Sequence, residues 1–310
     1  MKIAFLFPGQ GSQFAGMGKS LADSFACARA IFDQADDALS FPLSKLCFEG
    51  PAERLQLTEN TQPALLTVSV AAWSVLRENG IEPDYVAGHS LGEYSALVAA
   101  GSLSFGDAVR LVRKRGRYMQ EAVPPGIGAM AALLKLPAGK LEALLAEAAR
   151  DGEVLTSANL NSPDQVVIAG HFDAVDRAIK LAKAAGAKRA VPLPVSAPFH
   201  CPLMKPAQER LAVDLKRTAF ADLAVPLINN VAAREIRSGA EARQGLIEQV
   251  TGAVRWHESM RVLAALGIER FIEVGAGGVL TGLLRNIDPA LQCVRFGEAA
   301  DLDPLAAATV

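Results

Sequence analysis

The fold of this chain is decided by the stretch DYVAGHSLGEYSALVAAG, which covers residues 84–101. Its first four residues predict a short strand. Residues 91–100 predict a helix that ends at Gly101, because glycine commonly follows the last turn of a helix. Gly88 and Gly92 enclose the tight turn between the two. A strand, a tight turn and a helix in this order are typical of α/β proteins.

Segments on either side of this stretch extend the pattern. Residues 3–7 form a continuous apolar run that ends at Pro8-Gly9, as expected of a buried parallel strand. Residues 61–79 carry apolar side chains at helical spacing and are followed by Gly80. We therefore expect a large α/β domain built on a parallel sheet. Its later elements are predicted at residues 204–217 (a helix) and at 225–231 and 270–274 (two strands).

The middle of the chain has a different order of elements. Strands and helices follow one another there as β-α-β-β-α-β, which is the ferredoxin-like arrangement. We therefore predict a ferredoxin-like subdomain at residues 126–194, inserted into a large domain that consists of residues 1–125 and 195–310. The six elements are predicted at residues 128–136, 138–150, 154–160, 165–169, 174–185 and 188–193.

The composition limits the classes of function. Of the 310 residues, 51% are hydrophobic and 21% are charged, as in an ordinary globular protein. The formal net charge of −2 lacks the basic excess that nucleic-acid binding requires, so we expect no nucleic-acid partner. No apolar run approaches the roughly 18 residues of a membrane-spanning helix, and the N-terminal run is too short for a signal peptide. The four cysteines include no Cys-x-x-Cys pair, so we expect free thiols in the cytoplasm and no zinc site.

Ser90 lies at the centre of Gly88-His89-Ser90-Leu91-Gly92, which has the spacing of a nucleophile elbow. In an elbow the serine occupies a sharp turn, and its hydroxyl points outward beside free N–H groups that can bind an oxyanion. Flanking glycines let the strand and the helix approach closely. The alternative is a glycine-rich turn in which the serine only caps the helix. The strand before the motif and the helix after it favour the catalytic interpretation.

A serine hydroxyl needs a base to react at neutral pH, and the chain has four histidines. His89 adjoins Ser90, but neighbouring side chains on a sharp turn diverge, so we interpret it as structural. His171 follows a strand of the predicted subdomain, where a helix-capping role is expected, and His257 begins a predicted amphipathic helix. His200 lies between two prolines in a stiff loop after the subdomain, at the expected cleft between the domains. Elimination favours His200 as the base, and the substrate of Ser90 stays open at this point.

Several further motifs give the chain a family resemblance. They are FPGQGSQ at residues 7–13, TQPA at 61–64, GHSLGEY at 88–94, RG at 115–116, NSP at 161–163, VVIAG at 166–170 and FH at 199–200. Together these motifs resemble the malonyl-CoA:acyl carrier protein transacylases of bacterial fatty-acid synthesis, along nearly the whole chain. The fold of that family, a large α/β-hydrolase-like domain with a ferredoxin-like subdomain, agrees with the order of elements predicted above.

The resemblance implies roles for residues around the elbow. Ser90 would be the nucleophile that carries the acyl group, and His200 would be its base and later its acid. Gln10 and Leu91 would offer backbone N–H groups as the oxyanion hole. Gln249 would hold His200 through its backbone carbonyl, in place of the aspartate of a hydrolase triad.

The resemblance also implies residues that bind the substrate. Arg115 would bind the free carboxylate of a malonyl group through two parallel hydrogen bonds, which would select malonyl over acetyl thioesters. A solvated basic helix face is the usual alternative, because Arg115 has several basic neighbours. However, Arg115 does not share a helix face with these neighbours as a group. The basic neighbours are Arg110, Arg113, Lys114 and Arg117.

Gln62 and Asn161 would also line the site.

Two segments depart from the family pattern. Residues 275–278 are Gly-Ala-Gly-Gly, where the family usually shows proline and a lysine. Residues 250–253 are Val-Thr-Gly-Ala, where Leu-Tyr-Asn-Pro is typical. The first departure bears on a phosphate or carrier contact, and the second on the placement of Gln249.

The resulting hypothesis is a two-step exchange without a metal or bound cofactor. Ser90 would take malonate from malonyl-CoA and pass it to the phosphopantetheine thiol of holo acyl carrier protein, which supplies fatty-acid chain elongation. We expect a monomer that contacts neither nucleic acid nor membrane. The alternatives are a serine thioesterase or hydrolase on the same fold, a transacylase of a malonate or polyketide pathway, and a non-catalytic subunit that docks carrier proteins.

Overall fold

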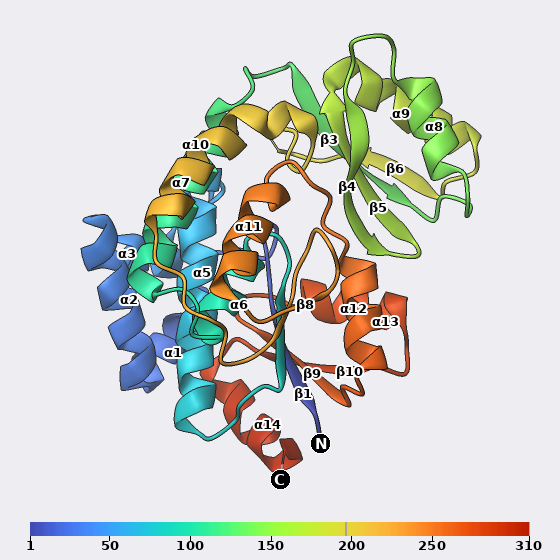
Figure 1. Cartoon of the computed structure of the whole chain (residues 1–310). Coiled ribbons are helices and arrows are strands. Elements are labelled where there is room, and N and C mark those ends of the chain that lie inside the picture. Colours follow the sequence, from blue (N-terminus) through green and yellow to red (C-terminus); the bar gives the residue numbers. More distant parts are fainter. Residues whose placement is uncertain (196, 310) are drawn as a thin grey trace.

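The computed structural model describes residues 1–195 and 197–309, and its strands form two separate sheets (Figure 1). The larger sheet has six strands in the order β10-β9-β1-β2-β7-β8. Neighbouring strands are parallel except for β8, which runs antiparallel to β7. Its strands are β1 (Ile3–Phe7), β2 (Tyr85–Gly88), β7 (Leu227–Ile228), β8 (Glu235–Ile236), β9 (Arg270–Val274) and β10 (Gln292–Phe296).

Strand β1 is buried on both faces, which explains its continuous apolar run. Phe5 and Phe7 belong to a core cluster on one face of the sheet, whereas Ala4 and Leu6 belong to a second cluster on the other face. All five residues of the strand are buried. A parallel strand that helices cover on both sides has no face exposed to water. A continuous apolar run is therefore expected in place of alternating polar and apolar residues.

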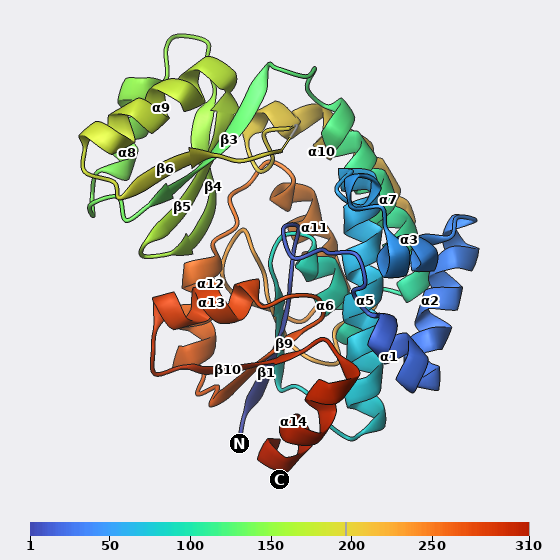
Figure 2. The same cartoon turned by 180° about the vertical axis from the view of Figure 1, so that it is seen from behind.

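Helices cover both faces of the larger sheet. Figures 1 and 2 show α12 and α13 on one side and α1, α2, α3, α5 and α7 on the other. None of the helices in the described part of the chain combines the length and apolar character needed to cross a membrane. The helices are α1 (Lys19–Ser24), α2 (Ala26–Leu39), α3 (Leu43–Glu49), α4 (Ala52–Leu55), α5 (Thr58–Glu78), α6 (Gly92–Ala99), α7 (Phe105–Glu121), α10 (Lys205–Arg217), α11 (Gly239–Gln249), α12 (Trp256–Ala265), α13 (Val279–Ile287) and α14 (Leu302–Thr309), with 3₁₀ turns at Pro202–Met204 and Ala299–Asp301.

The second sheet has the predicted ferredoxin-like order of elements. Its four strands are antiparallel in the order β4-β5-β3-β6. One face packs its own small core against two helices. Met130 and Val167 belong instead to the core of the large domain, so the other face of this sheet points toward the elbow. The elements are β3 (Gly128–Leu134), α8 (Leu141–Ala148), β4 (Leu155–Ser162), β5 (Gln165–His171), α9 (Phe172–Ala184) and β6 (Arg189–Pro192).

The structure corrects three sequence predictions. The strand predicted at residues 225–231 is only Leu227–Ile228, because the chain then turns back and the Asn229 N–H donates to the Arg234 carbonyl. The edge strands β8 and β10 were not predicted, since neither has a continuous apolar run. The turn predicted at residues 161–164 is shorter, because β4 continues to Ser162. The predicted large domain also includes Ser196 and Val310, which lie outside the described residues.

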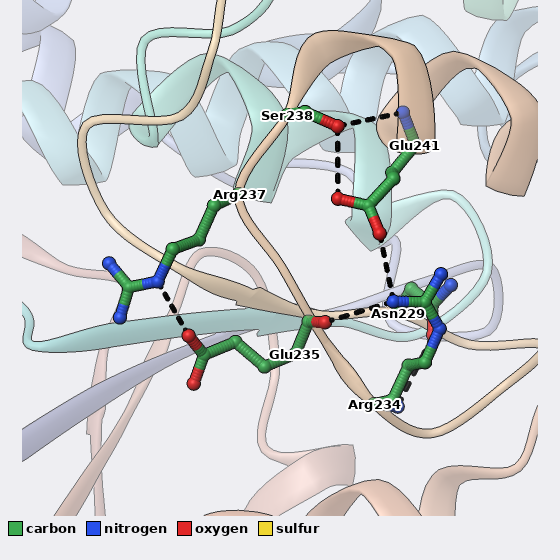
Figure 3. Close-up of polar contacts among 6 residues, drawn as sticks. All are labelled: Asn229, Arg234, Glu235, Arg237, Ser238 and Glu241. Carbon is green, nitrogen blue, oxygen red and sulfur yellow. Dashed lines mark hydrogen bonds and ion pairs between the residues drawn. The ribbon is translucent and has the colours of Figure 1, made fainter.

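Helix α11 is anchored at its N-terminus by a cluster of polar contacts, drawn in Figure 3. The Ser238 hydroxyl accepts a hydrogen bond from the Glu241 N–H at 3.3 Å and donates to the Glu241 carboxylate at 2.9 Å. Arg234 donates to the other carboxylate oxygen at 2.8 Å. An N-cap serine satisfies an N–H group that the first helical turn leaves free. These contacts fix the start of the helix whose last residue is Gln249.

The glycines of the elbow are required by close approach of backbones. A Cβ atom on Gly92 would lie 2.0 Å from the Phe7 carbonyl oxygen, and one on Gly88 would lie 2.0 Å from the Gly92 carbonyl carbon. Backbone atoms cannot move away from such a contact as a flexible side chain can. The sequence prediction that these glycines allow strand and helix to approach is therefore confirmed.

Gly92→Ala should lower the free energy of unfolding by about 3 kcal/mol, the cost of forcing extra volume into a packed interior. Gly282→Ala is the matched control, because a Cβ atom there meets nothing within 4 Å on helix α13. Alanine in a helix interior should stabilise by about 0.5–1 kcal/mol relative to glycine. Urea unfolding of both variants measures the difference. Equal stability of Gly92→Ala and the parent protein would contradict the tight packing of the elbow.

Candidate active site

Ser90 occupies the turn between β2 and α6 in a strained backbone conformation. Its φ angle is 51°, in the left-handed region that side chains rarely adopt. Asn230 holds this turn from both sides: its Oδ1 accepts the Ser90 N–H at 2.7 Å, and its Nδ2 donates to the Gly88 carbonyl at 2.7 Å. A residue kept in such a conformation by surrounding bonds is common at functional sites.

His200 is the histidine that reaches the Ser90 hydroxyl. Ser90 Oγ donates to His200 Nε2 over 2.7 Å, and His200 Nδ1 donates to the Gln249 carbonyl over 2.8 Å. His89 instead bonds Asn161 through Nε2 at 2.8 Å and packs against Trp256. The departure from the family pattern after Gln249 therefore leaves its carbonyl in reach of the imidazole.

The other two histidines lie elsewhere. His171 is at the N-cap position of α9, but its side chain does not cap that helix. Its Nδ1 accepts the Val154 N–H at 2.8 Å, which corrects the predicted capping role. His257 lies in the first turn of α12, as predicted.

Burial keeps the imidazole of His200 neutral. Removal from water, reinforced by the positive charge of Arg115, lowers the pKa of His200 to about 3. A neutral imidazole whose Nδ1–H faces a carbonyl has a free lone pair on Nε2, which is the atom that faces Ser90. The pair is therefore set for proton transfer from the serine hydroxyl to the histidine.

The rate at which a fluorophosphonate probe labels Ser90 should therefore be constant between pH 5 and pH 8. His200 binds a proton only near pH 3, so its folded-state pKa lies below this window and the base stays available throughout. Mass spectrometry of the labelled protein measures the rate, with His200→Ala as the unreactive control. A loss of labelling with a midpoint near 6.5, the ordinary value for histidine, would contradict this expectation.

Arg115 is buried beside the serine, unlike its basic neighbours on α7. Its side chain is 2% exposed, whereas those of Arg110 and Arg117 are about half exposed and paired with acids. Its guanidinium donates to Gln62 Oε1 at 2.7 Å, to Gln249 Oε1 at 3.0 Å and to Ser90 Oγ at 3.1 Å. A buried guanidinium at this place can bind a carboxylate on the acyl group that Ser90 carries.

A cavity of about 110 Å³ opens above Ser90 and is lined by Gln10, Gln62, Leu91, Arg115 and His200, among others. In the part of the chain that the structure describes, the backbone N–H groups of Gln10 and Leu91 donate to no other group. Leu91 is the N-cap of α6, so its N–H points out of the helix start. Two free N–H groups beside a serine can stabilise an oxyanion.

A larger cavity of about 420 Å³ adjoins the first and shares Gln10, Asn159 and Leu193 with it. Residues of the smaller sheet and of the large domain line it, including Val167 of β5 and Leu283 of α13. Asn161 lines this larger cavity rather than the one above Ser90. An elongated substrate can therefore reach the serine between the large domain and the smaller sheet.

Three polar residues of the site escaped the sequence reasoning. Asn230 holds the elbow, Glu93 is buried next to the Gln249 amide at 2.7 Å, and Asn159 lines both cavities. Glu93 had one local signal, a charged residue in an otherwise apolar stretch directly after the elbow. The two asparagines had none, because the fold brings them to the site from distant parts of the chain, Asn159 from β4 and Asn230 from the segment after β7. Across residues 1–195 and 197–309, no three His, Cys, Asp or Glu side chains are grouped so as to hold a metal ion.

Comparison with known proteins agrees with this arrangement. The acyl transferase domain family matches residues 4–292. The malonyl CoA-acyl carrier protein transacylase of Bacillus subtilis is 51% identical over 97% of this chain and 95% of its own length. The Escherichia coli K12 protein of the same name is 50% identical over 96% of each chain.

Solved structures give the same result. An acyl carrier protein S-malonyltransferase from Vibrio cholerae superposes with a TM-score of 0.96 at 47% identity, covering 98% of this chain and all of that one. A malonyl-transacylase in complex with its type II PKS acyl-carrier protein superposes with a TM-score of 0.96 at 44% identity, covering 99% of this chain and all of that one. This chain therefore belongs to the acyl transferase domain family and, within it, to the malonyl CoA-acyl carrier protein transacylases.

Proposed function

We propose that this acyltransferase moves the malonyl group of malonyl-CoA to the phosphopantetheine thiol of holo acyl carrier protein, through a malonyl ester on Ser90. The observation that carries the proposal is the pair Ser90–His200 beside the buried guanidinium of Arg115. A serine and a base provide acyl transfer, and the guanidinium supplies a partner for the free carboxylate of malonate. The names of the bacterial relatives support the same substrates.

The first step loads the enzyme. The Ser90 hydroxyl proton passes to His200 Nε2 while Ser90 Oγ attacks the thioester carbonyl carbon. The carbonyl oxygen becomes an oxyanion that accepts hydrogen bonds from the Gln10 and Leu91 N–H groups. The carbon–sulfur bond then breaks, and the coenzyme A thiolate takes the proton from His200. The Gln249 carbonyl keeps the imidazolium oriented meanwhile.

The second step reverses the first with another thiol. The carrier-protein thiol gives its proton to His200, and its sulfur attacks the ester carbonyl carbon on Ser90. When the tetrahedral intermediate collapses, Ser90 Oγ leaves with the proton from His200. The larger cavity leads a pantetheine arm to the serine from the side of Asn159 and Asn161. The exchange is balanced in atoms and charge and needs no resident metal or cofactor.

We also propose the boundaries of the subdomain, the cellular location of the enzyme and its oligomeric state. The subdomain spans residues 126–194, supported by the start of β3 at Gly128 and the end of β6 at Pro192. The four free thiols support a cytoplasmic enzyme. A monomer suffices, because Ser90, His200 and Arg115 meet within one chain, and a net charge of −2 favours no nucleic-acid partner. We propose that the enzyme serves fatty-acid elongation.

Incubation with malonyl-CoA, with and without holo acyl carrier protein, tests the function. Mass spectrometry should find a malonyl adduct on Ser90, and coenzyme A release should continue beyond one equivalent only when the carrier is present. Fast release that ignores the carrier would support a hydrolase instead. The absence of any adduct would support a non-catalytic carrier-binding subunit.

A further inference from the structure

Glu93 is a buried carboxylate that the two-step exchange does not use. It follows the elbow on α6 and is 1% exposed. One carboxylate oxygen, Oε2, accepts the Gln249 side-chain N–H at 2.7 Å and the Asn230 backbone N–H at 3.3 Å. Within the described residues, the other oxygen, Oε1, has no hydrogen-bond partner although it is shielded from water. A buried carboxylate in this situation is costly unless a nearby positive charge compensates it.

The positive charge that compensates Glu93 is Arg115, and the Gln249 carboxamide connects the two. Gln249 Nε2 donates to Glu93, and Gln249 Oε1 accepts from Arg115 Nη2 at 3.0 Å. If the amide were turned over, its NH₂ group would face the guanidinium and its oxygen would face the carboxylate, so both bonds would be lost. Arg115 and Glu93 therefore fix the amide from opposite ends, and the dipole of the amide lies along the line from anion to cation.

Few other charged groups take part in this arrangement. The groups that act on Glu93 are Gln249 from α11, Asn230 from the segment after β7, and Arg115 from α7; the guanidinium is the charged one. Tyr94, which follows on α6, stays a neutral phenol because burial raises its pKa. His200 is neutral as well, since its pKa is about 3. In the described part of the chain, the only other fully buried acid is Glu273, whose oxygens accept bonds from the start of α13.

We propose that Glu93 is a positioning residue that serves as the internal counter-ion of Arg115, in competition with the carboxylate of the bound substrate. The inference rests on the proposed function, which places a malonyl carboxylate on Arg115. In the empty site, Glu93 balances the guanidinium through Gln249. A bound malonyl group adds a second anion to the same cation, and this favours the neutral, protonated form of Glu93.

Proton uptake follows from this competition. Burial raises the pKa of Glu93 to about 7, so the carboxylate is partly ionised in the empty site at neutral pH. A second anion raises that pKa further, and by linkage the protonated form binds malonyl more tightly. If the protonated form binds malonyl about tenfold more tightly than the ionised form, the protein takes up about half a proton at pH 7.5. Malonyl affinity is then roughly eightfold higher at pH 6 than at pH 9, because it falls as pH rises through the titration of Glu93.

Calorimetry on the Ser90→Ala variant, which binds without reacting, tests the proposal. Malonyl-CoA and acetyl-CoA are titrated at pH 7.5 in two buffers of different ionisation enthalpy, which gives the protons taken up. Both ligands share the phosphates of coenzyme A, so the difference between them reports the carboxylate. We expect about half a proton more for malonyl-CoA in Ser90→Ala. In Ser90→Ala/Glu93→Gln we expect equal proton uptake for malonyl-CoA and acetyl-CoA. The ratio of the two affinities should then no longer depend on pH.

Glu273→Gln is the matched control, because it also replaces a fully buried glutamate by its amide, and Glu273 lines neither of the two cavities. In the Ser90→Ala background it should keep the extra proton uptake. If Ser90→Ala prefers malonyl-CoA to acetyl-CoA but takes up no extra proton, the role of Glu93 is wrong and the proposed function stands. This outcome needs only the Ser90→Ala variant, so it holds even if Glu93→Gln does not fold. Uptake that persists in the Glu93→Gln variant overturns the role of Glu93 as well. Equal affinity for malonyl-CoA and acetyl-CoA at every pH contradicts the malonyl site itself, and with it the proposed function.

Discussion

Ser90→Ala should reduce transfer from malonyl-CoA to the carrier protein by about 10⁴-fold or more, with no acyl adduct detectable by mass spectrometry. The reason is chemical rather than structural, because no other hydroxyl lies within bonding distance of His200 in the described residues. The base and the oxyanion donors remain, but nothing is left to form the ester. The fold should persist, since one small atom is lost from a partly buried turn.

Ser95→Ala is the matched control for this prediction. Ser95 lies on α6, directly after the turn that holds Ser90. It is fully buried, and its hydroxyl has no hydrogen-bond partner among the described residues. Its loss should leave the transfer rate within about twofold of the parent, because it touches none of the reacting atoms. A Ser90→Ala variant that still forms a malonyl adduct would place the nucleophile elsewhere.

Arg115→Ala should lower kcat/KM for malonyl-CoA by about 10²- to 10³-fold, while acetyl-CoA gains relative to it. Removing one partner of a buried charge pair costs about 3–5 kcal/mol, and tenfold in rate corresponds to about 1.4 kcal/mol. An acetyl group has no carboxylate, so it leaves the guanidinium of the parent protein without its substrate partner. Initial rates with both thioesters give the selectivity ratio directly.

Two further variants test whether the malonyl-to-acetyl ratio depends on the position of the charge and on its hydrogen-bond geometry. Arg117→Ala removes an exposed charge from the same helix and should leave the malonyl-to-acetyl ratio unchanged. Arg115→Lys keeps the charge but not the two parallel hydrogen bonds, so its ratio should lie between those of the parent and Arg115→Ala. An unchanged ratio in Arg115→Ala would remove this residue from substrate recognition.

Much of the fold was predictable from local pattern. The strands at residues 3–7 and 270–274 were predicted with their observed bounds. The first is a continuous apolar run that is buried throughout, and the second keeps Phe271, Ile272 and Val274 buried. The ferredoxin-like order was predictable because turns and helices separate its strands clearly. The edge strands β8 and β10 were not, since an edge strand is partly exposed and short, and pairing with a neighbour rather than its own composition makes it a strand.

The amino-acid sequence by itself determined the reactive turn, because a Cβ atom on Gly88 would lie 2.0 Å from the carbonyl carbon of Gly92 in the same motif, and that requirement is local. The motifs also singled out His200 and Arg115, and the family resemblance implied Gln249. Only the tertiary structure decided how these residues act together. It brings Asn230 to the Ser90 backbone across 140 residues and sets Gln249 between Arg115 and Glu93. Burial at that meeting point lowers the pKa of His200 and raises that of Glu93, because the cost of removing a charge from water depends on the packing around it and not on the neighbouring residues in the chain.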